Sequence, residues 1–169
     1  LHPQDGVLLD TNGTQQDSII IEYVYGTSAV DIPVANYYQS ITRDGYKFKG
    51  WYNAPSEGSK WLNIAQGKNQ NLWAQWLEER TVTYYSIGQV YDTQTYGSGE
   101  TLTLPTTDPT ACDGYTFVGW TSDEQIGETT TCPTLVSAST QITADETFYA
   151  VWEKADGSGD GLFHLVTDV

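Results

Sequence analysis

The chain has 169 residues, and its 22 acidic against 7 basic side chains give a formal net charge of −15. A surface this acidic is repelled by phosphate backbones and anionic lipids, so we expect no nucleic-acid partner. No apolar run approaches the ~18 residues of a membrane-spanning helix, so we expect no membrane insertion by this segment. The chain begins Leu-His-Pro and contains no Met. We therefore expect a processed product or a piece of a larger parent chain with adjacent domains.

Short β-strands dominate the elements predicted for the first half. An apolar run that starts at residue 7 ends at Asn12-Gly13, a dipeptide typical of tight turns. Residues 18–25 are rich in β-branched and aromatic side chains and predict a second strand, and residues 30–33 predict a short extended piece. The apolar residues that follow have helical spacing and predict one or two turns of helix: Val34, Tyr37, Tyr38 and Ile41.

One sequence pattern, G-Y-x-F-x-G-W, occurs at residues 45–51 and again at residues 114–120. Its aromatic residues alternate with other side chains, which predicts a strand with one buried face. Strict alternation would turn the Trp away from that face, so the Gly before it predicts a β-bulge that turns the Trp inward. We expect a structural role, as anchors of two cores, for Gly45, Tyr46, Phe48, Gly50 and Trp51, and for Gly114, Tyr115, Phe117, Gly119 and Trp120.

The order of elements repeats on both sides of residues 77–80. Strands predicted at 71–76 and 147–152 close the two copies, with Trp76 and Trp152 in matching positions. The piece after the motif Trp is longer in the second copy (121–147) than in the first (52–71), so the second copy is elaborated there. We predict two modules, a linker, and then either the start of a following domain or an extra strand, at residues 1–78, 79–154, 155–161 and 162–169.

With both copies in register, the chain resembles the internalin B-repeat family, also called the Listeria–Bacteroides repeat. The resemblance rests on the Asn-Gly turn, a central Tyr-Gly, the G-Y-x-F-x-G-W strand and the closing strand that ends in Trp, over roughly residues 6–154. It implies an α+β, mostly β fold of two tandem, small β-grasp-like (ubiquitin-like) modules. It also implies an extracellular location on the bacterial cell surface, a role as a stalk or spacer with a contribution to adhesion, and no catalytic residues or cofactors.

Both cysteines, Cys112 and Cys132, lie in the second module. A bridge between them would close a loop of about 20 residues and stabilise the module by roughly 3 kcal/mol on the chain-entropy model. Because the resemblance implies an oxidising compartment, we expect a disulfide, with two free thiols as the alternative. We expect no metal, because two cysteines fall short of four zinc ligands. Residues 156–161 outline a calcium loop whose twelfth position would be Thr167 instead of Glu, which favours a flexible linker.

Nothing in the sequence supports an enzyme. The two histidines, His2 and His164, lie near opposite termini, and no nucleophile elbow, phosphate-binding loop or metalloprotease motif occurs. Four aromatic residues outside the repeated strand are candidates to stack on sugars, or instead to seal the small cores or the module junction: Tyr37, Tyr38, Trp61 and Trp73. We therefore predict a spacer that presents a neighbouring domain, and as the alternative a module that binds a host or environmental glycan or glycoprotein.

Overall fold

The described residues of the computed structural model are 1–22, 32–64, 70–110, 114–124, 127–154 and 163–165. The chain divides into two compact units, Leu1–Glu79 (unit 1) and Arg80–Val169 (unit 2). Within the described residues the regular structure is β-strand except for one turn of 3-10 helix. The expectation of a mostly β fold is therefore confirmed.

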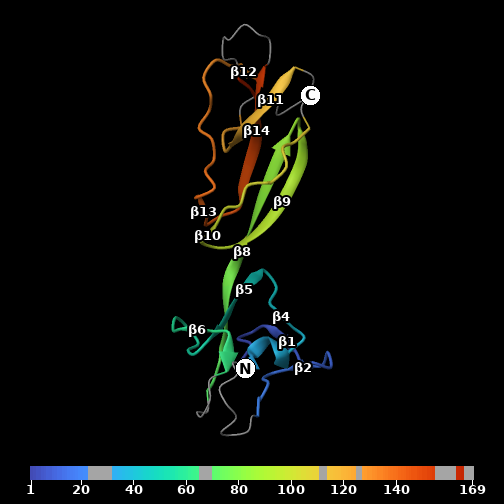
Figure 1. The fold of residues 1–169 in the computed structure, drawn as a ribbon, viewed down its shortest axis with the longest axis vertical. Coiled ribbons are helices and arrows are strands. Elements are labelled where there is room, and N and C mark those ends of the chain that lie inside the picture. The colour runs from blue at the N-terminus through green and yellow to red at the C-terminus, as the bar shows by residue number, and fades with distance from the viewer. Residues whose placement is uncertain (23–31, 65–69, 111–113, 125–126, 155–162, 166–169) are drawn as a thin grey trace. The chain divides into compact units, whose positions relative to one another are not determined.

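The main sheet of unit 1 is built on β5 (Tyr46–Tyr52), the first copy of the repeated strand (Figure 1). β5 lies between the first half of β8 (Trp73–Ser86) and β6 (Lys60–Trp61), and pairs antiparallel with both. Tertiary packing of this sheet against the smaller ladders buries one apolar cluster. Its buried members are Leu8, Val34, Trp51, Leu72 and Ala74.

Two smaller ladders complete unit 1. β1 (Val7–Leu9) lies between β2 (Gln15–Gln16) and β4 (Ser40–Thr42), and is antiparallel to both. β3 (Ile32–Pro33) pairs with β7 (Asn63–Ile64). The β1–β4 and β3–β7 ladders join segments far apart in the sequence, so their pairing depends on the collapsed core and not on local turns alone.

The helix predicted at residues 34–41 is shorter in the structure. A single 3-10 turn, η1 (Val34–Tyr37), buries Val34, and Tyr38 is already extended with φ −145° and ψ 154°. Ile41 belongs instead to β4, opposite the buried Leu8 of β1. This pairing overrides the helical spacing, which is only a local signal. The strand predicted at 18–25 is also wrong where it is described, because residues 18–22 form no regular element; residues 23–31 lie outside the described residues.

The predicted bulge is present in both copies of the repeated strand. The pairing of β5 shifts register between Phe48 and Gly50, and that of β11 (Tyr115–Thr121) shifts between Phe117 and Gly119. After the bulge, Trp51 is 4% exposed and Trp120 is 3% exposed. The prediction that the glycine turns the following Trp into the core is therefore confirmed.

Unit 2 is organised around β14 (Glu146–Lys154), which pairs antiparallel with β11 (Figure 1). Residues 146–149 of β14 also pair in parallel with the second half of β8. β9 (Gln89–Gly97) pairs with β8, and β10 (Glu100–Thr101) pairs with β13 (Gln141–Ile142). The buried cluster of this unit comprises Val82, Tyr84, Tyr96, Leu102, Trp120, Ile142, Phe148, Ala150 and Trp152.

The C-terminal segment adds a strand to the sheet of unit 2. β15 (Phe163–Leu165) pairs antiparallel with the end of β14, where Trp152 lies opposite His164. β12 (Gly127–Thr129), from the elaborated segment after the motif Trp, pairs with β15 in turn. The predicted linker and the calcium-loop outline at 156–161 lie outside the described residues.

Candidate functional site

A groove of about 200 Å³ lies beside the bulge of β5 in unit 1. Tyr38, which follows η1, and Trp61 of β6 line it, and both are half-buried. Trp51 also lines the groove, meets Tyr38 edge to face with ring centroids 5.7 Å apart, and lies opposite Trp61 in the β5–β6 ladder. We call this site the Trp61 groove; its other lining residues are Val34, Ala35, Phe48, Lys49, Gly50, Lys60 and Leu62.

Two exposed lysines border the Trp61 groove. The side chain of Lys60 lies across Gly50, so closely that a Cβ atom added at Gly50 would be 2.5 Å from Lys60 Cε. The Lys49 ammonium lies 5.2 Å from the centroid of the Tyr52 ring, within the range of a cation–π contact. Glycine at position 50 thus has two uses: it permits the bulge, and it leaves room for the lysine chain.

Sequence reasoning missed both lysines as site residues. Alternation along β5 places Lys49 on the solvent-exposed face of the strand. No local sequence pattern shows that the Lys60 side chain lies over the glycine of a neighbouring strand. The distribution of charge along the sequence could have pointed to these lysines. Residues 1–78 hold 5 of the 7 basic side chains with 8 acidic ones, whereas residues 79–169 hold 2 basic and 14 acidic side chains.

Unit 2 fills the equivalent space with an apolar side chain. In the β5–β6 ladder of unit 1, Tyr52 lies opposite Lys60. At the matching point of unit 2, Thr121 lies opposite Leu135. Leu135 covers the bulge glycine, because its Cδ1 would be 3.1 Å from a Cβ atom added at Gly119. The two modules therefore share a backbone frame but differ in the chemistry of the side chain over the bulge.

The four aromatic residues predicted as sugar-stacking candidates do not form one platform. Tyr38 and Trp61 share the Trp61 groove, whereas Tyr37 belongs to η1 and does not line it. Trp73 lines a separate, polar pocket of about 380 Å³, where its ring stacks on His2 with 5.5 Å between centroids. Unit 2 has a similar cross-strand stack between Tyr85 and Tyr149, which favours a structural role for the Trp73 contact.

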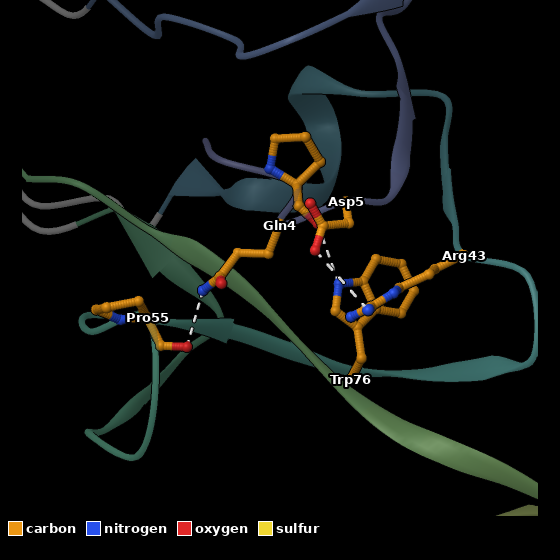
Figure 2. Close-up of polar contacts among 6 residues, drawn as sticks. Gln4, Asp5, Arg43, Pro55 and Trp76 are labelled. Carbon is orange, nitrogen blue, oxygen red and sulfur yellow. Dashed lines mark hydrogen bonds and ion pairs between the residues drawn. The ribbon is translucent and has the colours of Figure 1, made fainter.

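The N-terminal segment is held to unit 1 by side-chain hydrogen bonds (Figure 2). Gln4 Nε2 donates to the Pro55 carbonyl oxygen at 2.8 Å, and Trp76 Nε1 donates to the Pro3 carbonyl oxygen at 3.0 Å. Trp76 thus packs against the core cluster while its indole N–H is hydrogen-bonded. Its counterpart Trp152 is 1% exposed, and its indole N–H has no partner among the described residues.

Arg43 connects this segment to the first residue of β5. Its guanidinium lies 3.8 Å from the Asp5 carboxylate and 4.0 Å from the centroid of the Tyr46 ring (Figure 2 shows the ion pair). Tyr46 is half-buried and is not among the described residues of the apolar cluster that holds Phe48 and Trp51. The Tyr at the first aromatic position of the motif therefore makes a cation–π contact with Arg43 in unit 1. In unit 2 the equivalent Tyr115 packs against the core.

The predicted disulfide is not supported by the structure. Cys132 is a free, half-buried thiol, and Cys112 lies outside the described residues. The entropic gain of loop closure favours a bridge only where the fold brings two thiols into bonding geometry, which spacing in the sequence does not establish. In the part of the chain that the structure describes, no three metal-ligating side chains come together.

Comparison with known proteins shows the family. The model of the Listeria-Bacteroides repeat domain matches residues 7–75 and, a second time, residues 81–151. The chain therefore belongs to the Listeria–Bacteroides repeat family and contains two tandem copies of its domain. Each match includes one copy of the G-Y-x-F-x-G-W strand with its bulge.

Among its relatives is internalin H of Listeria monocytogenes, which is 34% identical over 82 residues, 47% of this chain and 15% of that protein. A protein of Evansella cellulosilytica named "Putative Gly-rich membrane protein" is 32% identical over 153 residues, 87% of this chain and 16% of that protein. The chain thus spans less than a fifth of the length of these relatives. Within its described residues, no helix has the length and apolar character needed to cross a bilayer.

Proposed function

We propose that this chain is a non-catalytic repeat region of an extracellular bacterial surface protein, where it acts as a stalk or spacer. In this role it presents a neighbouring domain and serves adhesion through that domain. The observation that carries the proposal is the tandem arrangement: two copies of one small module follow each other at residues 7–75 and 81–151, with only residues 76–80 between the matches. Modules joined with so short a connection suit a repeated structural element.

The resemblance to internalin H and to an Evansella protein named as a membrane protein supports a surface location. A β-grasp-like arrangement of the modules is supported in unit 2 by the parallel pairing of residues 82–85 with residues 146–149. In this arrangement the first and last strands of the module lie side by side.

A distance measurement between the units tests the spacer. Spin labels at Ser56 and Asp108, both exposed, would be introduced as Ser56→Cys and Asp108→Cys with Cys112→Ser and Cys132→Ser. Pulsed dipolar spectroscopy should give one narrow distance distribution, because a spacer must hold its ends at a defined separation. A broad distribution spanning many separations would contradict the proposal. Paired labels within unit 1, at Ser56 and Asn12, provide the width expected for a single module.

A second candidate function, binding of a glycan or glycoprotein, is favoured by one observation. Tyr38 and Trp61 share the Trp61 groove with two lysines, whereas unit 2 covers the same place with Leu135. A purely structural spacer would not require this difference between the two modules. A binding module would also be compatible with a spacer role, because the repeat can carry a groove without losing its structural use.

A further inference from the structure

We propose that the Trp61 groove binds the terminal acidic sugar of a glycan, with one carboxylate placed between Lys49 and Lys60. This inference rests on the second candidate function and specifies its ligand. The ring of the sugar would pack against Tyr38 and Trp61, and the acidic group would meet the two ammonium groups at the rim. Aromatic side chains supply large apolar contact area together with a polar edge, which suits an amphipathic sugar ring.

The size of the Trp61 groove limits the ligand. Its volume of about 200 Å³ is below the ~300–1,000 Å³ typical of pockets for drug-sized ligands. A single sugar ring is therefore a better match than an extended peptide. Leu62, which is 70% exposed beside the groove, extends the apolar surface for the next part of a ligand.

Charge selects a ligand that carries one acidic group. Within the described part of the chain neither Lys49 nor Lys60 forms an ion pair, so both ammonium groups are available to an anion. The rest of the molecule is strongly acidic, with a net charge of −15. A long polyanion would extend from the groove onto that surface and be repelled, whereas a single carboxylate would meet only the local lysines.

Trp51 provides a reporter for the groove. Its side chain is 4% exposed and lines the groove, where its ring meets the Tyr38 ring edge to face. A sugar ring that packs against Tyr38 would therefore change the surroundings of the Trp51 indole.

Unit 2 provides an internal comparison. Val118 occupies the motif position of Lys49, and Leu135 lies over the bulge where Lys60 lies in unit 1. The backbone N–H of Val136 donates to Trp120 O in unit 2, where Trp61 pairs with Trp51 in unit 1. Both lysines and Trp61 are therefore exchanged for aliphatic residues in the other module, and the bulge itself is kept.

The residues that unit 2 has at these positions also supply substitutions for unit 1, because the shared backbone frame already accepts them in unit 2. We would titrate the intact two-unit chain with 3′-sialyllactose, whose terminal sugar carries one carboxylate, and with lactose as its neutral control. A disaccharide ending in glucuronic acid distinguishes the two common sources of such a carboxylate. Calorimetry measures affinity, and the indole N–H resonance of Trp51 in ¹H–¹⁵N spectra reports on occupancy of the groove.

We expect binding of at least one acidic sugar, no binding of lactose, and a shift of the Trp51 indole resonance. Lys60→Leu and Lys49→Val should each weaken binding by about tenfold or more, because each removes a charge-assisted contact. Trp61→Val should abolish stacking and binding. Lys47→Thr, which removes an exposed positive charge of β5 outside the groove, should change affinity by less than about twofold. Unchanged dispersion of the ¹H–¹⁵N spectra shows that each variant is folded.

Several results would overturn this inference. Equal binding of lactose would show that the lysines do not select the ligand, and equal losses for Lys47→Thr and Lys60→Leu would show only general electrostatic attraction. Tighter binding of a heparin tetrasaccharide or a poly-glutamate peptide would indicate a different partner class. A blank with every sugar would also reject the inference, but it would leave the spacer proposal standing, because the distance measurement tests that proposal independently.

Discussion

Phe48 and Trp51 meet edge to face, with ring centroids 5.5 Å apart and planes inclined at 69°. In an unbroken strand, side chains three positions apart point to opposite faces. The bulge at Gly50 brings the two rings onto one face, and Phe117 and Trp120 repeat the contact at 5.3 Å. Such pairs contribute about 0.5–1.5 kcal/mol beyond the area they bury. The repeated motif thus provides an aromatic pair whose contact depends on a glycine.

Gly50→Ala should destabilise unit 1 by about 1–3 kcal/mol. Gly50 has φ +140°, which disfavours alanine, and the added Cβ would also displace the Lys60 chain. Urea unfolding followed by tryptophan fluorescence measures the effect. Lys47→Thr, on the exposed face of the same strand, keeps the glycine and should cost less than Gly50→Ala. An alanine variant as stable as the parent would show that the bulge does not need glycine.

Local signals predicted the repeated strand, its bulge and the closing strands. Alternating aromatic residues and a glycine before Trp are readable within one short motif, and the same pattern in two places strengthened each assignment. The prediction of a helix at 34–41 was wrong because the conformation of this segment depends on a distant part of the chain. Ile41 pairs with Leu8, which lies far earlier in the chain, and no property of the segment itself reveals that partner.

The candidate site was only half predictable. Tyr38 and Trp61 stood out as aromatic residues outside the motif, but Tyr37 and Trp73 looked equivalent to them in sequence. What separates the two pairs is the return of β6 beside β5, which places Trp61 opposite Trp51 and carries Lys60 across Gly50. Because that arrangement arises only in the tertiary structure, residue spacing in the sequence could not identify the two lysines as site residues.

Ile87→Asn should stabilise unit 2 by about 1 kcal/mol. Ile87 and Gly88 connect β8 to β9, and both have positive φ, 53° and 67°, as a type I′ turn requires. A β-branched residue is unfavourable there, whereas Asn tolerates this conformation. Thermal unfolding should show a raised Tm for Ile87→Asn. Ile87→Val keeps the β-branch and should show no gain; equal Tm values for the two variants would rule out turn strain as the cause.

Asp10→Asn should destabilise unit 1 at neutral pH, and the difference from the parent should shrink in acid. Hydrogen bonds from the Thr14 backbone, the Gln16 side chain and the Asn12 backbone hold the pKa of Asp10 below its ordinary value of 3.8. A carboxyl group with a lower pKa in the folded state stabilises the fold above its unfolded pKa. That contribution is lost as the pH falls through the folded value.

Urea unfolding at pH 7 and at a series of values down to about pH 3, around the ordinary carboxyl pKa, measures this difference. Asp17→Asn is the matched control, because it makes the same charge change at an exposed carboxylate with no hydrogen bond to the described residues. It should show little difference from the parent at any of these pH values. A pH-independent effect of Asp10→Asn would mean that shape at the turn, and not ionisation, is responsible.

Tyr84→Phe should remove part of the alkaline instability of unit 2. Burial, with added repulsion from Tyr96 and Asp92, raises the pKa of Tyr84 well above its ordinary value of 10.0. A phenol with a higher pKa in the folded state stabilises the fold below its unfolded pKa. That contribution is lost as the pH rises from about 10 toward the folded value.

The hydroxyl of Tyr84 is buried without a hydrogen-bond partner among the described residues. Its removal should therefore leave stability at pH 7 within about 1 kcal/mol of the parent. Between about pH 9 and 11, around the ordinary tyrosine pKa, the free energy of unfolding should fall less steeply for Tyr84→Phe than for the parent. Tyr85→Phe makes the same chemical change on the half-buried neighbour and is the control for removal of a phenol from β8. If both variants lose stability as steeply as the parent, ionisation of Tyr84 does not drive alkaline unfolding.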